Sequence, residues 1–167
     1  MNSHKLSPPL VCGFGAAVLS TIPGVKSLGC CLIIPIAAWL SLVLNEKLNK
    51  VQPPVPIQDA FFFGLLTGFF AAIFSTGTDV LITLITHTND FVQTLPQTES
   101  VLKGWNLGGL WTETSSLLHK MSSDIQKNGF SLLYTTAILF SNAIIDSIFG
   151  MIGGLIGMSI QNKKKNY

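Results

Sequence analysis

Residues 60–85 read AFFFGLLTGFFAAIFSTGTDVLITLI and decide the fold class of this chain. The stretch has 26 residues and a single ionisable side chain, Asp79. A helix crosses the hydrocarbon core of a bilayer with roughly 20 predominantly apolar residues. The stretch is therefore predicted to be a membrane-spanning helix.

Three other stretches, residues 10–25, 28–44 and 130–160, are comparably apolar. The last has 31 residues, whereas the first two have only 16 and 17 and are joined by a tight turn. These two short stretches are expected to cross a locally thinned bilayer as a hairpin, and a re-entrant pair is the alternative. The sequence thus predicts an all-α membrane protein with four transmembrane helices in a single membrane domain, residues 1–167.

Composition excludes several classes of protein. Of the 167 residues, 11% are charged, against about 25% in a typical soluble domain. All 10 basic residues are lysine and the net charge is +2, so the chain lacks the basic stripe of a nucleic-acid-binding protein. The cysteines and histidines show no metal-ligand spacing, and no catalytic motif occurs. We expect the lipid bilayer as a partner, and no nucleic acid, metal, cofactor or enzymatic activity.

Lysine placement predicts the orientation in the membrane. Lys163, Lys164 and Lys165 form the strongest positive cluster, and cytoplasmic segments of membrane proteins carry an excess of lysine and arginine. With four spans, the N-terminus lies on the same side. Both termini are therefore expected in the cytoplasm, and a bacterial inner membrane is the expected location. Cleavage of residues 10–25 as a signal peptide is the less favoured alternative.

The segment between the third and fourth stretches, residues 86–129, is the only sizeable polar region and is interpreted as an outer insertion. From residue 107 to 125 its apolar residues recur near helical spacing, which predicts an amphipathic helix that ends at Asn128 and Gly129. Trp105 and Trp111 suit the headgroup layer of a membrane. The helix is expected to lie on the membrane or on the other helices, and binding to a partner is the alternative.

Small residues mark the third and fourth stretches as helix-packing surfaces. The glycines predicted to pack against other helices are Gly64, Gly68, Gly150, Gly153, Gly154 and Gly157. Glycines four residues apart let helix backbones approach closely in lipid. The contacts they make are expected within the four-helix unit, and self-assembly or docking to a partner helix is the alternative.

Ionisable groups inside apolar spans are candidates for functional sites. Asp79 and Asp146 are the two such groups, and Asn142 and Thr78 add polar atoms nearby in the sequence. Counting along the helices places both aspartates near the outer boundary of the membrane. The cluster is interpreted as an interfacial pin between two spans, and a proton- or cation-handling site is the alternative. An aspartyl protease dyad is disfavoured, because no Gly-x-Gly-Asp run is present.

Four short motifs support a resemblance: STIP at residues 20–23, CC at 30–31, QDAF at 58–61 and FGMIGGLIG at 149–157. With these motifs the chain resembles a loose group of small four-span bacterial membrane proteins of unknown function, which implies the fold but no functional residues. The predicted function is a non-enzymatic structural or accessory subunit of a membrane assembly or homo-oligomer. A small proton- or ion-coupled transporter or channel that uses the aspartates is the alternative.

Overall fold

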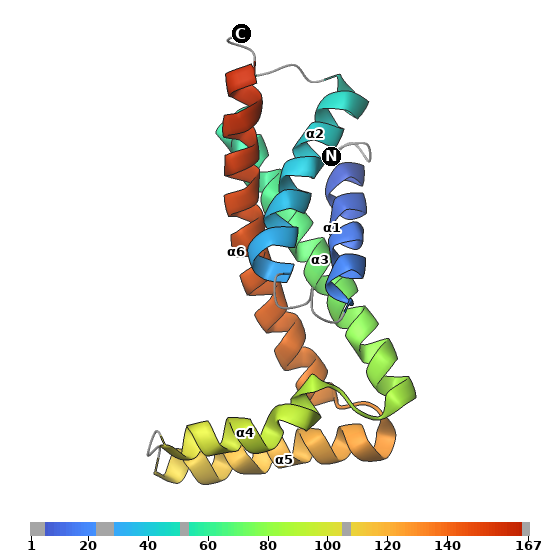
Figure 1. Cartoon of the computed structure of the whole chain (residues 1–167), viewed down its shortest axis with the longest axis vertical. Coiled ribbons are helices and arrows are strands. Elements are labelled where there is room, and N and C mark those ends of the chain that lie inside the picture. The colour runs from blue at the N-terminus through green and yellow to red at the C-terminus, as the bar shows by residue number, and fades with distance from the viewer. Residues whose placement is uncertain (1–5, 23–28, 51–53, 105–107, 165–167) are drawn as a thin grey trace. The chain divides into compact units, whose positions relative to one another are not determined.

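The computed structural model describes residues 6–22, 29–50, 54–104 and 108–164, which contain helices and no strands. The elements are α1 (Ser7–Ser20), a π-helical turn (Gly29–Ile33) that leads into α2 (Ile34–Asn49), α3 (Ile57–Thr86), α4 (Asp90–Gly104), α5 (Gly109–Asn128) and α6 (Leu132–Lys164) (Figure 1). The expected all-α class is confirmed.

Three of the described helices are long and apolar enough to cross a membrane: Cys31–Asn49 with 19 residues, Ile57–Thr86 with 30 and Leu132–Lys163 with 32. The helix in the expected span at residues 10–25 is shorter than these three. Its helix, α1, covers Ser7–Ser20 and has 14 residues, which gives a length of about 21 Å at 1.5 Å per residue. The structure therefore supports three crossings, and a fourth crossing by α1 stays a prediction.

Local sequence sets the ends of these helices. Pro8 and Pro9 lie in the first turn of α1, where their missing N–H groups leave no hydrogen bond unmade. Lys50 ends α2 in the left-handed conformation, with φ of 51°. Gly129, with φ of 67°, ends α5 as expected, and its N–H donates to the carbonyl of Ile125 at 2.8 Å.

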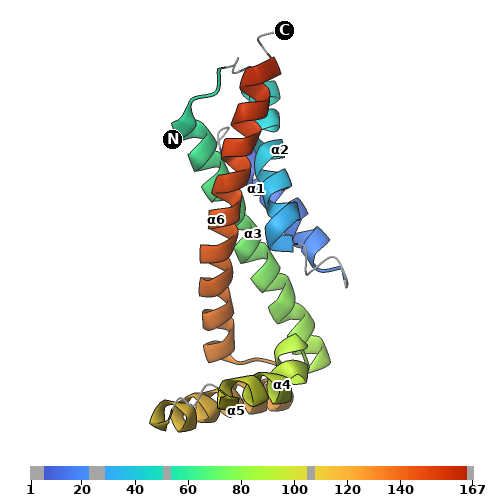
Figure 2. The same ribbon diagram turned by 60° about the vertical axis from the view of Figure 1, so that its left-hand side comes forward.

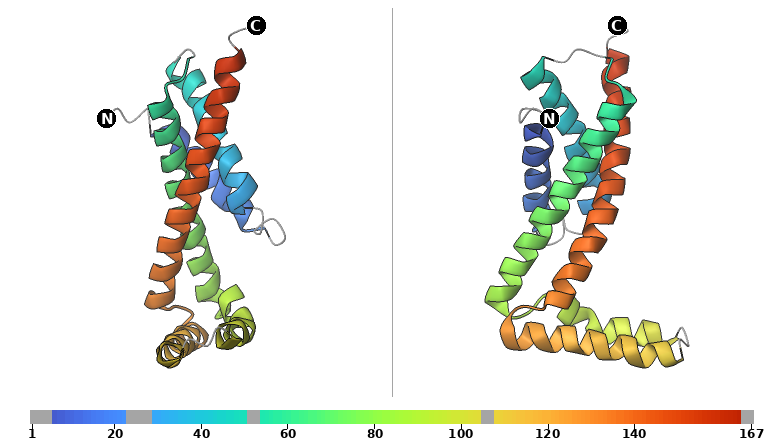
Figure 3. Two further views of the ribbon diagram at one scale, coloured as in Figure 1. Left: turned by 90° about the vertical axis from the view of Figure 1, so that its left-hand side faces the viewer. Right: turned by 180° about the vertical axis from the view of Figure 1, so that it is seen from behind.

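The chain divides into two compact units. The first unit comprises Met1–Thr78 and Leu139–Tyr167, and the second comprises Asp79–Ile138. In the first unit α1 and α2 lie next to each other and against α3 and α6, as Figures 2 and 3 show from several sides. The chain leaves the first unit through α3 and returns to it through α6.

Side-chain size separates the inside of the first unit from its outside. On α6 the isoleucines at 144, 148, 152 and 156 are exposed, while the small face that carries Gly150 and Gly154 is buried. Alanines make up much of the buried core: Ala16, Ala17, Ala37, Ala38, Ala60, Ala71 and Ala72. Outward-facing large apolar residues around a small-residue core are the arrangement that lipid favours, because lipid solvates the former and close backbone packing needs the latter.

The second unit contains two antiparallel helices where the sequence predicted one. In addition to α5, the segment forms α4, and the two lie side by side (Figures 1 and 3). His119 Nε2 of α5 lies 2.8 Å from Glu99 Oε1 of α4. The Lys103 ammonium of α4 lies 5.8 Å from the centre of the Trp111 ring of α5. These contacts join the last part of α4 to α5.

Candidate functional site

The candidate site lies in the contact between α3 and α6 of the first unit. We call this contact the α3–α6 seam: Ala60, Gly64, Gly68, Ala72 and Thr76 of α3, and Asn142, Asp146, Gly150 and Gly154 of α6. Each set follows a four-residue spacing, which places its members on one face of a helix. Apart from the half-buried Asn142, every member is buried.

Glycine allows the two backbones of the seam to touch. A Cβ atom on Gly64 would overlap the carbonyl of Gly150, and one on Gly68 would overlap the carbonyl of Asp146. In the same way Gly154 meets the carbonyl of Ala60. As residue numbers rise on α3 the contacting numbers fall on α6, so the helices run antiparallel.

The two remaining predicted packing glycines contact α2. Gly153 lies against the backbone of Pro35, and a Cβ on Gly157 would be 2.7 Å from Cδ1 of Trp39. All six predicted glycines therefore make close contacts within the chain. Of the two interpretations of these glycines, this geometry matches internal packing.

Polar side chains meet at the Thr76 end of the seam. Asn142 Nδ2 donates a hydrogen bond to Thr76 Oγ1 at 3.2 Å. Asp146 follows one helical turn later on the same face of α6. Its residue is 8% exposed, and that of Thr76 is 3% exposed. The hydrogen bond between Asn142 and Thr76 thus links the two helices at this end of the seam.

Asp146 has no hydrogen-bond or ion-pair partner within the described ranges. The antiparallel register sets Gly68 of α3 level with it. Ser75 lies one residue before Thr76, and its hydroxyl donates to the carbonyl of Ala72 at 3.2 Å. The carboxylate oxygens of Asp146 are not among the fully buried side-chain atoms without a partner in the described residues, which belong to Trp39, Asn89 and Gln161.

The other members of the predicted polar cluster lie elsewhere. Thr78 donates to the carbonyl of Phe74 in its own helix at 2.8 Å, and Asp79 belongs to the second unit. The polar partner of Asn142 is thus Thr76, which the predicted cluster did not include. Thr76 continues the four-residue spacing of Gly68 and Ala72, and this pattern is the signal that could have identified it.

Sequence reasoning also missed a buried polar pair between α2 and α3. Thr67 Oγ1 donates to Ser41 Oγ at 3.1 Å, and both residues are 0% exposed. Ser41 Oγ donates to the carbonyl of Ala38, and Thr67 shares its single proton between Ser41 Oγ and the carbonyl of Phe63. Both hydroxyls have partners inside the chain, and the pair therefore serves packing.

A groove lies between α1 and the beginning of α2. It has a volume of about 240 Å³ and is lined by Cys12, Gly15, Ala16, Leu19, Ile33, Ile36, Ala37 and Leu40. A Cβ on Gly15 would meet nothing within 4 Å, whereas one on Gly13 would lie 2.9 Å from the carbonyl of Thr67. Gly13 therefore packs α1 on α3, and Gly15 faces the open groove.

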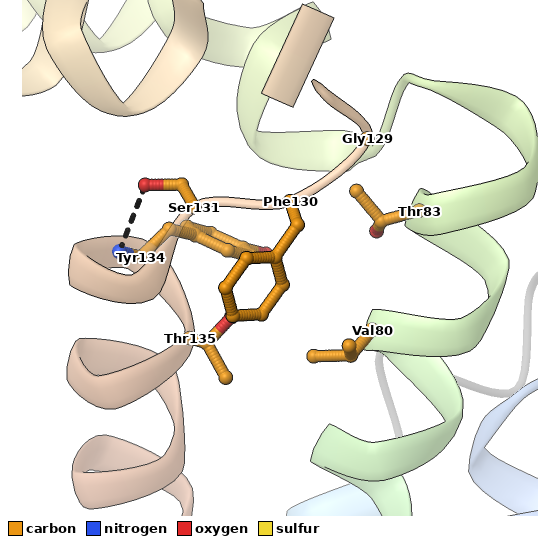
Figure 4. Close-up of a pocket in the computed structure, with 7 residues that line it drawn as sticks. All are labelled: Val80, Thr83, Gly129, Phe130, Ser131, Tyr134 and Thr135. Carbon is orange, nitrogen blue, oxygen red and sulfur yellow. Dashed lines mark hydrogen bonds between the residues drawn. The ribbon is translucent and has the colours of Figure 1, made fainter. Parts of the chain in front are cut away.

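The second unit contains a tight junction between the end of α3 and the start of α6 (Figure 4). Val80 and Thr83 point from α3 toward Phe130, in the turn that follows α5. Ser131 Oγ accepts a hydrogen bond from the N–H of Tyr134 at 3.4 Å and so caps α6. The space between these side chains is too small for a water molecule, so the junction is packing and not a binding site.

The predicted interfacial tryptophans have different outcomes. Trp111 is half-buried on α5, under Lys103 of α4. Trp105 lies outside the described residues. No group of three or more His, Cys, Asp or Glu residues that could hold a metal occurs in the described part of the chain.

Comparison with known proteins adds no relative: no family model, curated protein or solved structure matches the chain. The function must therefore be argued from the site.

Proposed function

We propose that the protein is a non-enzymatic accessory subunit that packs against other membrane proteins or a second copy of itself within the bilayer. The observation that carries the proposal is the open groove between α1 and α2. The glycines of the α3–α6 seam are already in contact inside the chain, whereas Gly15 presents a bare backbone to the groove. Small residues on lipid-facing helices favour close helix association.

The test is the native mass of the purified 18.0 kDa chain in mild detergent, measured for the wild type and for Gly15→Leu. We expect an assembly larger than the monomer, and we expect Gly15→Leu to break it because its side chain fills the groove. Gly77→Leu is the matched control, since a Cβ on Gly77 of α3 also meets nothing within 4 Å. A wild type that is monomeric with no co-purifying subunit would contradict the proposal.

The proposed location is a bacterial inner membrane with both termini in the cytoplasm. Lysine placement supports this orientation, and it requires α1 to cross in addition to α2, α3 and α6. A bilayer thinned around the short α1 accommodates such a crossing at a modest energetic cost. In a variant without the native cysteines, single cysteines at Asn2 and Asn166 should both resist labelling from outside intact cells. Labelling of Asn2→Cys alone would instead indicate three crossings.

A further inference from the structure

A nine-residue stretch of α1 is repeated in α3. Residues 13–21 read GFGAAVLST and residues 68–76 read GFFAAIFST, so six of the nine positions are identical at a constant offset of 55 residues. Both copies use their glycine for packing. Gly13 lies against the backbone of α3, and its counterpart Gly68 lies against the backbone of α6. The two copies therefore correspond in structure as well as in sequence.

The surface of α3 that receives α1 has a counterpart on α1 itself. A Cβ on Gly13 would lie within 3.0 Å of three residues of α3, and the Phe14 ring lies 5.2 Å from the ring of a fourth. These four residues are Thr67, Phe70, Ala71 and Phe74. At the offset of the repeat their counterparts are Cys12, which directly precedes the repeat, and Gly15, Ala16 and Leu19. The same four residues form the α1 side of the open groove.

Two differences within the repeat concern the size of side chains at the groove. Gly15 stands where α3 has Phe70, and Leu19 stands where α3 has Phe74. The surface of α1 is therefore the less filled of the two. The opposite wall of the groove is apolar as well and comprises Ile33, Ile36, Ala37 and Leu40. Because no residue that lines the groove is charged, it suits an apolar helix surface.

A suitable helix surface lies beside the groove on α1. Val11 and Val18 are 56% and 48% exposed, and their spacing of seven residues places them on one side of the helix, with Gly15 between them. A second copy related by a two-fold axis presents the same ridge and the same groove, so each ridge fits the groove of the other copy. Pairing also lowers the cost of mismatch for a helix of about 21 Å in a hydrocarbon core of roughly 30 Å.

We propose that the groove binds α1 of a second copy of this chain. The two copies form a symmetric dimer, in which the ridge of Val11 and Val18 of each α1 enters the groove of the other. This inference rests on the accessory role proposed above and names the partner. The chain thus uses one type of helix surface twice, inside the chain on α3 and between copies on α1.

Co-purification separates this dimer from the accessory role in general. Two full-length copies with different affinity tags are co-expressed, and one of them is purified in mild detergent. We expect the other tag to co-purify. Recovery of a different subunit without the second tag would overturn the dimer and leave the accessory role standing, whereas a lone monomer would overturn both.

Disulfide cross-linking locates the contact. In a variant without the native cysteines, Val18→Cys should form a disulfide-linked dimer in membranes under mild oxidation. Ile73→Cys is the matched control and should stay monomeric, because position 73 is the counterpart of position 18 in the repeat and is also exposed, at 39%. Equal cross-linking at the two positions, or at position 73 alone, would refute the proposed face.

Filling the groove tests its role directly. Adding Gly15→Phe to Val18→Cys should abolish the cross-link, because the phenylalanine that α3 carries at position 70 then occupies the groove. Gly77→Phe is the matched control and should keep the cross-link, since a Cβ on Gly77 also meets nothing within 4 Å. A cross-link that persists with Gly15→Phe would show that the groove is not the contact.

Discussion

Replacing Gly68 by alanine should destabilise the protein, because the added Cβ would overlap the carbonyl of Asp146. Backbone lies on both sides of this contact, so no flexible side chain can move out of the way. Overpacking of a well-packed core typically costs about 1–3 kcal/mol. We expect Gly68→Ala to lie at the upper end of that range, because α3 and α6 must separate to accommodate the methyl group.

The control for this substitution is Gly77→Ala. Both glycines lie within α3, but a Cβ on Gly77 meets nothing within 4 Å. Alanine in a helix interior is favoured over glycine by roughly 0.5–1 kcal/mol, so Gly77→Ala should be neutral or stabilising. The gain in helix propensity is common to both variants, so they should differ in free energy of unfolding by the cost of overpacking alone, about 1–3 kcal/mol.

Reversible unfolding in mixed detergent micelles, followed by helical circular dichroism, measures this difference. Gly64→Ala should reproduce the loss, because its Cβ would overlap the carbonyl of Gly150. If Gly68→Ala and Gly64→Ala are as stable as Gly77→Ala, then α3 and α6 are not in backbone contact and the reasoning about the seam fails.

Three further predictions concern single interactions. Thr67→Val should lower the free energy of unfolding by roughly 0.5–2 kcal/mol in the same assay, since it leaves the buried Ser41 hydroxyl without its partner in α3. Gly129→Ala should destabilise the second unit by about 1–3 kcal/mol, because an L-residue is strained at φ of 67°; amide hydrogen exchange at the end of α5 should speed up, and unchanged exchange would contradict the cap. Glu99→Gln should weaken the contact with His119 by less than about 1 kcal/mol, because the histidine is largely exposed; a larger loss would indicate a buried ion pair.

Three of the four expected spans have helices that are long and apolar enough to cross a bilayer, and these could be predicted because length and hydropathy determine that property. The end of α5 was also predictable, because Gly129 is a helix-terminating residue in the expected place. Pro8 and Pro9 lie in the first turn of α1, just before the apolar stretch that begins at residue 10, in keeping with the preference of proline for that position. The helix α4 was missed because it is polar and contains Pro96, a residue that normally disrupts a helix interior.

Contacts between helices were harder to predict than the helices themselves. Successive residues on a helix differ by about 100° in direction, so a neighbour in sequence is not a neighbour in space. Thr78 is predicted as part of the polar cluster because it is near Asp79 in the sequence. On the helix, however, Thr76 is the residue that points toward Asn142, and Thr78 bonds to its own helix. The pairing of Ser41 with Thr67 depends in the same way on the register between α2 and α3, which hydropathy does not specify.

Side-chain volume carries the information that hydropathy lacks in such helices. On α6, Asp146 shares the four-residue spacing of Gly150 and Gly154, so the small face of the helix includes it. On α3 the corresponding positions are 60, 64, 68, 72 and 76, and all five are buried. Asp79 lies three residues beyond Thr76, where α3 enters the second unit, and it is half-buried. The small-residue spacing therefore identifies the buried face of each helix within the first unit. Asp146 lies on that face of α6, and its burial follows from the close approach of α3 at Gly68.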